Sequence, residues 1–364
     1  MSAIIVIACF TFPYKANNAV AETPSERAEV IVQKAVRTTK NWKLPPAGPK
    51  ASSNKTVTYL ADNLLNGGIL GVGEGVTEAA DVLGWKVRVI DTLGNAAGRD
   101  AALRKVTRLK PDGLILGSLN AGGYVKQLAT IAGNGTKIVG WHAAATPGPI
   151  VGTPVRFNVA TDPIDVGVTA ASFAVVDSKG TAGVVVFTDA DYEIALAKSD
   201  AMAEVIRRCG GCTLLSVENV SLAKTAEIMP GLINDLLRRY GDRWTHTLGI
   251  NDLYFDFAAP TLAIADAASA ARIANISAGD GSASAYGRIR AGSFQVATVP
   301  EPLTLHGWQL IDELNRAFVG APPSGYIAPV RFVLPENVNK ASGDRNTFDP
   351  INGYRDAYRA SWGR

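Results

Sequence analysis

The sequence predicts an α/β protein of two doubly wound, Rossmann-like lobes, with hinge crossovers between them and a ligand cleft where they meet. Its 364 residues are 47% apolar and 19% charged, which is enough material for two globular domains. From about Lys55 onward, short apolar stretches alternate with segments of helical periodicity, a pattern typical of parallel sheets with helices on both faces. The alternation runs in two series, separated by residues 158–163.

The N-terminal residues have the character of a secretory signal peptide. An apolar run, too short to span a bilayer, precedes Ala-Val-Ala at 19–21, which suits a cleavage site. We therefore expect a signal peptide over residues 1–21 and export of the mature protein. Two alternatives stay open. Because no positive charge precedes the run, translation could start further upstream, and residues 6–9 resemble a lipoprotein box that would anchor Cys9 to lipid.

Residues 22–54 are expected to form one helix and an extended linker. Thr23 resembles a helix cap, with Pro24 and Glu26 in the first turn near the positive end of the helix dipole. Residues 40–55 are polar and rich in proline, which predicts an extended segment leading into the first lobe.

The first series predicts an N-terminal lobe of residues 55–142 and 302–327. Its strands are expected at 56–61, 86–91, 112–118 and 137–142. Its helices are expected at 71–84, 98–110 and 121–134, and a further helix at 304–320 follows a proline-flanked joint.

The second series predicts a C-terminal lobe of residues 143–301 and 328–338. Its strands are expected at 182–188, 212–220, 245–251, 271–279, 294–299 and 328–335. Its helices are expected at 165–178, 193–209, 226–241, 257–268 and 283–292. Residues 339–364 form a tail with arginines and aromatics, expected to pack on the surface of a lobe or, alternatively, to dock a partner.

Polar and aromatic side chains gather at the carboxyl ends of the predicted strands, where open α/β sheets bind ligands. They are Asp62, Asn66, Ser118, Asn120, Trp141, His142, Thr188, Asp189, Asn251, Asp252, Asp280 and Glu301. Carboxylates and amides exchange hydrogen bonds with hydroxyls, and flat rings cover the C–H faces of a sugar. The set therefore suits a polyhydroxylated ligand. Each such residue also makes turns and helix caps, so their joint position carries the prediction.

Residues 249–257 place two aspartates four residues apart among aromatic side chains. We expect Asn251 and Asp252 to face the cleft and Tyr254 to line it. Asp256 falls in the first turns of the following helix, where a carboxylate favours the positive end of the dipole and needs no ligand to explain it.

Other chemistries find weaker support. The chain has no G-x-S-x-G elbow and no Ser/His/Asp order around its three histidines, so no catalytic residue is predicted. Asp189 and Asp191 have the spacing of a metal loop without its glycine bend, and the glycines of residues 71–75 depart from the dinucleotide pattern. We therefore expect neither a metal nor a cofactor.

The net charge and the cysteine pair at 209 and 212 each allow one further interpretation. The net charge of +3 is spread over 36 basic and 33 acidic residues, without the cationic stripe that binds nucleic acid. Cys209 and Cys212 are interpreted either as a local disulfide or as two quiet thiols.

Several segments resemble the type I periplasmic sugar-binding proteins of ABC importers, the ribose-binding and LacI-like group. They are residues 111–123, 137–143, 249–263, 276–292 and 296–318, within a likeness that covers about 55–338. The resemblance implies two lobes that close over a ligand like a hinge. It places the hinge crossings near residues 142–145, 299–301 and 325–329.

The resemblance also implies positions that hold the ligand. Asn66, Asp280 and the Asn251–Asp252 pair match the family's polar positions. At three other positions this chain departs from the family: it has Asn120 where the family has an acid, Glu301 where the family has an amide, and Lys198 where the family has an arginine. These departures argue against ribose or galactose as the ligand. The ligand-binding residues we predict are Asp62, Asn66, Asn120, Trp141, Asp189, Tyr192, Lys198, Asn251, Asp252, Tyr254, Asp280 and Glu301.

An exported protein of this group captures a sugar, polyol or related hydroxylated molecule and delivers it to an ABC permease in the inner membrane. We expect such a receptor, acting as a monomer. One alternative is a sensor that presents its closed form to a chemoreceptor or kinase. Another is a sugar-modifying enzyme, which rests only on the clustered acids. A DNA-binding regulator is disfavoured because the first ~50 residues carry a signal-like segment and one helix instead of a headpiece.

Overall fold

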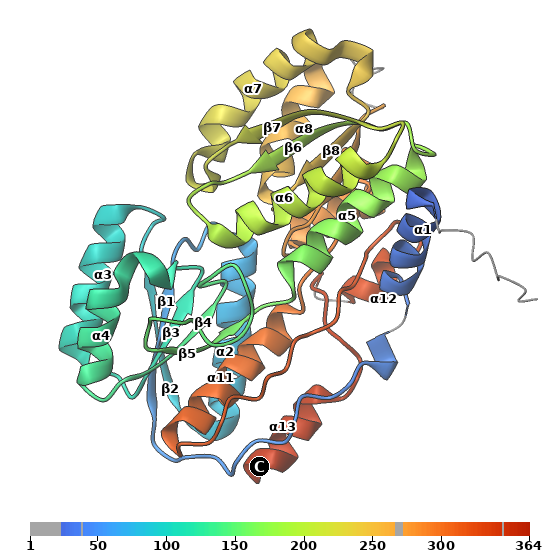
Figure 1. Ribbon diagram of the computed structural model, residues 1–364. Helices are drawn as coiled ribbons and strands as arrows, with labels where there is room; N and C mark the ends of the chain where they lie inside the picture. The colour runs from blue at the N-terminus through green and yellow to red at the C-terminus, as the bar shows by residue number, and fades with distance from the viewer. Residues whose placement is uncertain (1–22, 38, 266–271, 344–345) are drawn as a thin grey trace, which may run out of the picture.

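The computed structural model describes residues 23–37, 39–265, 272–343 and 346–364. The predicted signal peptide and Cys9 lie outside these residues. Two lobes, each built around a five-stranded parallel sheet, are stacked with a waist between them (Figure 1). The prediction of two parallel α/β lobes is therefore confirmed.

The first sheet has the strand order β2-β1-β3-β4-β5. Its strands are β1 (Thr56–Ala61), β2 (Lys86–Asp91), β3 (Gly113–Gly117), β4 (Lys137–Trp141) and β5 (Val155–Val159). Successive residues point to opposite faces, so Tyr59 packs against helices α2 (Gly67–Leu83) and α11 (Leu303–Phe318), whereas Leu60 packs against α3 (Ala96–Leu109) and α4 (Val125–Gly133).

Strand β5 corrects the predicted lobe boundary. Residues 155–159 were placed in the C-terminal lobe without a strand, but β5 pairs in parallel with β4 in the first sheet. The chain therefore crosses to the second lobe at Ala160–Asp162 and not near residues 142–145. The stretch "VRFNV" alternates apolar and polar residues, but five positions are too few to separate a strand from a loop, and only its pairing with β4 decides the matter.

The second sheet has the strand order β10-β9-β8-β6-β7. Its strands are β6 (Gly183–Thr188), β7 (Thr213–Asn219), β8 (His246–Gly249), β9 (Ala274–Ser277) and β10 (Ala297–Thr298). Helices α5 (Pro163–Asp177) and α6 (Glu193–Arg208) cover one face, and α7 (Thr225–Tyr240) and α8 (Leu253–Ala265) cover the other (Figure 1). Helix α10 (Ala283–Ala291) lies beside α8.

Two more crossings join the lobes. Residues 299–302 lead from β10 into α11, as expected. The return crossing lies between Ala328, in the core of the first lobe, and Phe332, in the core of the second. The strand expected at 328–335 is reduced to a single antiparallel bridge between Val333 and Thr298.

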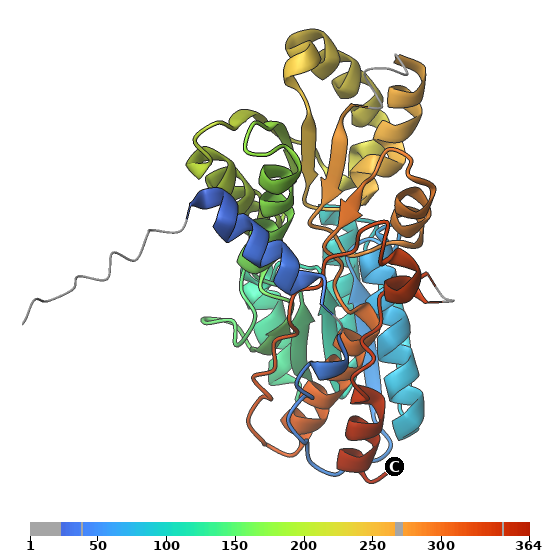
Figure 2. The same ribbon diagram turned by 90° about the vertical axis from the view of Figure 1, so that its right-hand side faces the viewer.

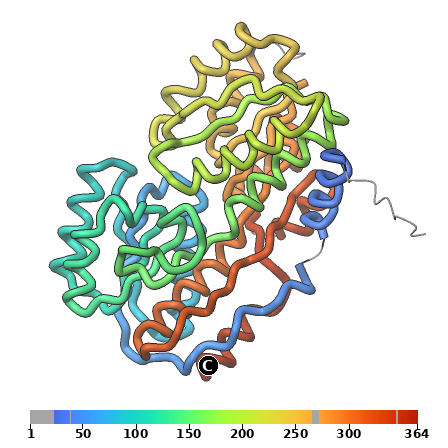
Figure 3. Tube along the Cα trace, viewed as in Figure 1, coloured from blue at the N-terminus to red at the C-terminus, as the bar shows by residue number. Residues whose placement is uncertain are grey.

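The terminal segments also connect the lobes. Helix α1 (Pro24–Ala35) packs on α5 of the second lobe, and the chain then runs back along α11 of the first (Figure 2). Helix α12 (Val338–Ser342) packs on α10, and α13 (Tyr354–Trp362), next to the C-terminus, packs on α11 (Figure 3). The Trp308 and Trp362 rings stack between α11 and α13, with their centroids 5.4 Å apart. The predicted surface tail is thus part of the fold. Short 3-10 turns lie at Thr39–Asn41, Ala121–Tyr124, Leu222–Lys224 and Gly241–Arg243.

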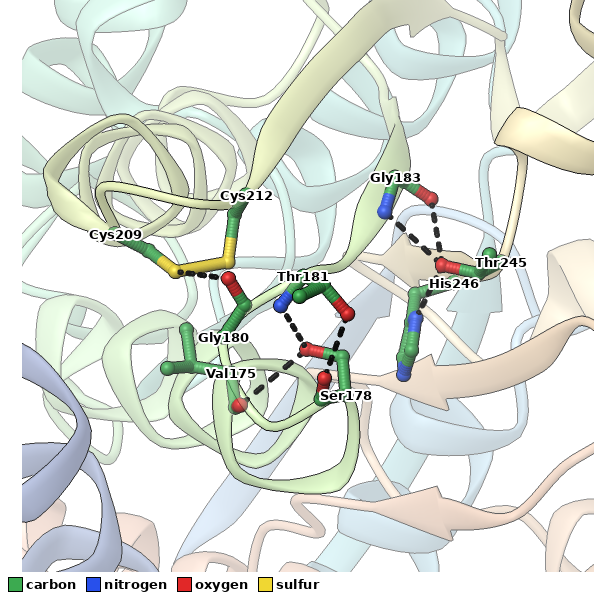
Figure 4. The surroundings of a disulfide bond; sticks show 9 residues. All are labelled: Val175, Ser178, Gly180, Thr181, Gly183, Cys209, Cys212, Thr245 and His246. Atoms are coloured by element: carbon green, nitrogen blue, oxygen red, sulfur yellow. Dashed lines mark hydrogen bonds between the residues drawn. A yellow bond between two sulfur atoms is a disulfide. The ribbon is translucent and has the colours of Figure 1, made fainter.

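Cys209 and Cys212 form a disulfide in the turn between α6 and β7 (Figure 4). Of the two interpretations of this cysteine pair, the structure therefore contains the disulfide and not two free thiols. Cys209 Sγ also lies 3.6 Å from the carbonyl oxygen of Gly180, the residue that follows α5 and its capping turn. None of the described helices has the length and apolarity needed to cross a membrane.

Candidate ligand-binding site

A cavity lies between the lobes, at the carboxyl ends of strands from both sheets. The empty space there is about 380 Å³ when the solvent at its open mouth is included. The first lobe lines it with Asn66, Ile69, Ser118 and His142, and the second with Tyr192, Ile194, Ala195, Lys198, Leu222, Ile250, Asn251 and Asp280. Five of the predicted residues therefore meet at one place: Asn66, Tyr192, Lys198, Asn251 and Asp280.

Glu301 lies beneath this cavity, on the second crossing, and is fully buried. One carboxylate oxygen is 2.9 Å from His142 Nε2, and another contact, of 3.4 Å, joins Glu301 to Lys198 Nζ. Burial raises the pKa of Glu301, but His142 and Lys198 outweigh it and hold that pKa well below its usual range. The carboxylate is therefore ionised, and His142 donates through Nε2–H.

His306 supports this arrangement from below. Its Nδ1 accepts a hydrogen bond of 3.1 Å from Trp141 Nε1, and burial lowers the pKa of His306 to about 4. Since an acceptor nitrogen carries no proton, the 3.5 Å contact between Nδ1 and Glu301 is not an ion pair. His306 is neutral at pH 7 and holds Trp141, whose ring stacks on His142 at 3.7 Å.

Asp280 faces both lobes at the side of the cavity. Its Oδ2 accepts from Asn251 Nδ2 at 2.9 Å, and its Oδ1 lies 4.0 Å from Lys198 Nζ. Burial raises the pKa of Asp280, and Lys198 and His142 offset part of that rise. An ideal Cβ placed on Gly68 would overlap Asp280 Oδ2, so the first turn of α2 approaches Asp280 as closely as only glycine permits.

Asn66 caps the helix that makes this approach. Its Oδ1 accepts from the Gly68 backbone N–H at 2.9 Å, which explains why α2 begins at Gly67 and not at residue 71. Among the described residues, the Asn66 amide nitrogen and the Ser118 hydroxyl have no hydrogen-bond partner. Both groups remain able to bind a ligand hydroxyl.

Asp62 and Asn120 do not line the cavity, in contrast to the prediction. The Asp62 carboxylate accepts from Arg99 at 2.6 and 2.7 Å and from the Tyr192 hydroxyl at 2.6 Å. Asn120 Nδ2 donates to Glu193 Oε1 at 3.2 Å. The Arg99 bonds stay within the first lobe, whereas the Tyr192–Asp62 and Asn120–Glu193 bonds each join a strand end of the first lobe to the N-terminal end of α6 in the second, so they hold the lobes together.

Asp189 and Asp252 shape loops of the second lobe. Asp189 accepts from the backbone N–H of Leu222 at 2.7 Å. Asp252 Oδ2 accepts from the Gly281 N–H at 2.8 Å, and its Oδ1 accepts from Gln295 Nε2 at 2.7 Å. These bonds occupy the carboxylates that were predicted to contact ligand.

Trp141 and Tyr254 belong to the packed core. Trp141 is fully buried beneath His142. Tyr254 was expected to line the cleft, but its hydroxyl donates to the Val220 carbonyl at 2.9 Å within the core of the second lobe. Helix α8 starts at Leu253, four residues earlier than predicted, and this start turns Tyr254 inward. Asp256 pairs with Arg288.

Some lining residues were not in the predicted set. Ser118 and His142 directly follow strands and adopt left-handed backbone angles, with φ of 64° and 52°. Their position at strand ends was the available signal. The aliphatic residues, such as Ile69 and Ile250, gave no signal, because apolar residues at such places usually enter the core.

His142, Asp280 and Glu301 place one potential metal-ligand atom each within 4.8 Å of one another. The ammonium of Lys198 lies within 4.0 Å of both carboxylates. A fixed cation therefore already sits between the acids, and repulsion opposes a metal ion there.

The fold and this interlobe cavity define a two-lobed binding protein. Residues 59–321 match the periplasmic binding protein domain family, and the chain belongs to that family. No match was found among curated proteins.

Solved structures of similar fold include a substrate-binding protein of a sugar ABC transport system from Bordetella parapertussis. It is 17% identical with a TM-score of 0.69, over 89% of this chain and 99% of that one. An ABC transporter solute binding protein from Agrobacterium vitis with bound allitol is 17% identical, with a TM-score of 0.68. The match covers 80% of this chain and 98% of that one. The Caulobacter myo-inositol binding protein, bound to myo-inositol, is 18% identical, with a TM-score of 0.67. The match covers 80% of this chain and 97% of that one.

Proposed function

We propose that this protein captures a sugar, polyol or related hydroxylated molecule between its lobes and delivers it to an ABC importer. The observation that carries the proposal is the interlobe cavity, where amide, hydroxyl, ammonium and carboxylate groups of both lobes converge. The allitol and myo-inositol complexes of similar fold support it, because both ligands are small polyols.

Ligand contact falls to the residues that line the cavity with polar atoms. Asn66 and Ser118 bind from the first lobe, and Lys198, Asn251 and Asp280 bind from the second. Branched aliphatic side chains, among them Ile69 and Ile250, cover the C–H surface of the ligand.

The other predicted residues act around this set. Glu301 positions His142 and Lys198, and Trp141 supports the His142 ring. Tyr192, besides lining the cavity, bonds to Asp62 across the lobes. Ligand binding is therefore coupled to lobe closure, which the crossings at the waist allow.

The proposed place of action is the periplasm, with export by the signal peptide predicted at residues 1–21 and with a permease of the inner membrane as partner. The disulfide between Cys209 and Cys212 supports an oxidising compartment. We propose that the protein acts there as a monomer and releases its ligand unchanged.

A panel of aldoses, alditols and cyclitols tests the proposal by thermal shift. A ligand that binds only the folded protein raises the unfolding free energy by about 2.7 kcal/mol at one hundred times its Kd. We expect at least one panel member to do so, and native mass spectrometry of freshly purified protein to show a retained neutral solute. If no member of the panel raises the melting temperature, the proposal is contradicted. If the ligand is recovered chemically altered after long incubation, the protein is an enzyme. Measuring ligand uptake by a strain that lacks this protein separates transport from sensing, because only transport requires the protein for uptake.

A further inference from the structure

Segments near the two ends of the chain meet at the waist and form a strap, which we define as residues 39–43 and 346–353. Thr39 Oγ1 accepts a hydrogen bond of 3.1 Å from the backbone N–H of Ile351, and this bond joins the two halves of the strap. Figure 2 shows the halves at the waist, one in blue and the other in red. Each half therefore holds the other in place.

Trp42, in the strap, packs on both lobes. Its ring meets the ring of Phe348 edge to face, with the centroids 5.7 Å apart. Phe348 is buried in a cluster with Tyr286 and Ile289 of α10, in the second lobe. Trp42 packs on this cluster and also on the core of the first lobe, to which Tyr326 contributes. A movement of one lobe against the other must therefore change the surroundings of Trp42.

Arginine side chains fasten the strap and the chain next to it to both lobes. In the second lobe, Arg290 of α10 donates to Asn346 Oδ1 at 2.9 Å. In the first, Arg355 of α13 donates to Glu78 Oε1 of α2 at 2.5 Å. The N-terminal half is held by α1, which packs on α5 of the second lobe, and by Arg316 of α11, which donates to two backbone carbonyls beyond the strap at 2.9 Å each. Both halves are thus attached to both lobes.

The strap is separate from the crossing that lies beside it. A cavity lined by Trp42, Asp165, Pro329 and Val330 lies between the strap and the third crossing. The crossing therefore has room to bend, whereas Trp42 is packed on both lobes.

From these contacts we infer that the strap is a conformational device that limits how far the lobes open, with Trp42 as its central residue. Closely packed side chains fit in one arrangement, so rotation of one lobe leaves a gap beside Trp42 or forces an overlap. Either outcome raises the free energy of the open state relative to the closed one. The inference goes beyond the proposed function, because the residues that line the interlobe cavity all lie outside the strap.

The distance between spin labels on the two lobes tests this inference in ligand-free protein. Lys126→Cys on α4 and Asn234→Cys on α7 place the labels at exposed positions of different lobes. Cys9→Ser leaves these two as the only thiols to label, because Cys209 and Cys212 form a disulfide. Double electron-electron resonance then measures the distribution of distances. Because no ligand is needed, this test and the sugar panel can fail independently.

Trp42→Ala removes the ring that packs on both lobes. We expect longer distances than in the wild type and a ratio of open to closed molecules raised at least about fivefold. Phe318→Ala is the matched control, since Phe318 is a partly buried aromatic residue that packs within the first lobe alone, against Trp85. It should keep the wild-type distances.

Two results would overturn the inference. One is a folded Trp42→Ala whose distances are unchanged or shorter, and the other is a Phe318→Ala that lengthens them as much as Trp42→Ala does. If circular dichroism shows that Trp42→Ala does not fold, Phe348→Leu decides by the same criteria, because it removes the ring pair and keeps an apolar side chain.

Discussion

Tyr192 donates its hydroxyl to Asp62 across 2.6 Å, and this hydrogen bond joins the two lobes at the edge of the cavity. Burial raises the pKa of Tyr192 far above its ordinary value, so the hydroxyl stays protonated and remains a donor. Arg99 holds the Asp62 carboxylate in place from the other side. The closed arrangement is thus stabilised by a bond that involves no ligand.

Tyr192→Phe removes this bond and keeps the ring. A hydrogen bond to a charged group contributes about 1.5–3 kcal/mol, so we expect roughly tenfold weaker ligand binding through a less populated closed state. The ligand found by the thermal-shift panel, measured by calorimetry and by its dissociation rate, checks this. Tyr124→Phe, on a partly buried tyrosine of the first lobe, is the control. Equal affinity in both variants would show that the bond does not contribute to closure.

Gly68→Ala places a methyl group against Asp280 in the closed arrangement. Overpacking of this kind costs about 2 kcal/mol, which corresponds to roughly 30-fold in affinity. Because the clash exists only when the lobes meet, we expect weaker binding and a more extended particle in small-angle scattering. Gly123→Ala is the control, since a Cβ there meets nothing within 4 Å. Unchanged affinity in Gly68→Ala would contradict the close approach.

Asn251→Ala and Asp280→Ala each remove one partner of the 2.9 Å hydrogen bond at the cavity wall. We expect both variants to fold, as judged by circular dichroism, and to lose the ligand-induced rise in melting temperature, because a lost partner leaves buried polar groups unsatisfied at about 1–3 kcal/mol each. Asp81→Ala, on an exposed residue of α2, should keep the full shift. Binding retained in both cavity variants would remove these residues from the site.

Glu313 predicts a pH dependence of stability. Burial raises its pKa from 4.5 to about 7, so between these values the folded protein binds a proton that the unfolded chain has released. Stability therefore falls as pH rises through this window, by up to about 3 kcal/mol from this group.

Glu313→Gln cannot titrate. It should raise the melting temperature relative to the wild type at pH 8 and change it little at pH 4.5. Thermal unfolding at the two pH values measures this, with exposed Glu336→Gln as the control. A gain of the same size at both values would show that Glu313 acts through packing and not through its proton.

The sequence by itself determined the two α/β series and part of the site. Alternation of apolar strands and helical segments is a local signal, and among the described residues it located nine of the ten strands, with β5 the exception. Asn66, Asn251 and Asp280 were found because they follow strands at the carboxyl ends of the two sheets, which meet at the interlobe cavity. The same reasoning correctly set Asp256 apart as a residue of a helix start.

Only the tertiary structure decided what each strand-end residue contacts. Asp62 resembled a ligand residue as much as Asp280 did, but Arg99 and Tyr192 approach it from other elements and occupy its oxygens. Asp252 is saturated by donors that come from β10 and its neighbourhood. Hydrogen-bond partners distant in the chain leave no trace in local sequence, so the division into ligand contacts, lobe contacts and loop supports follows from packing alone.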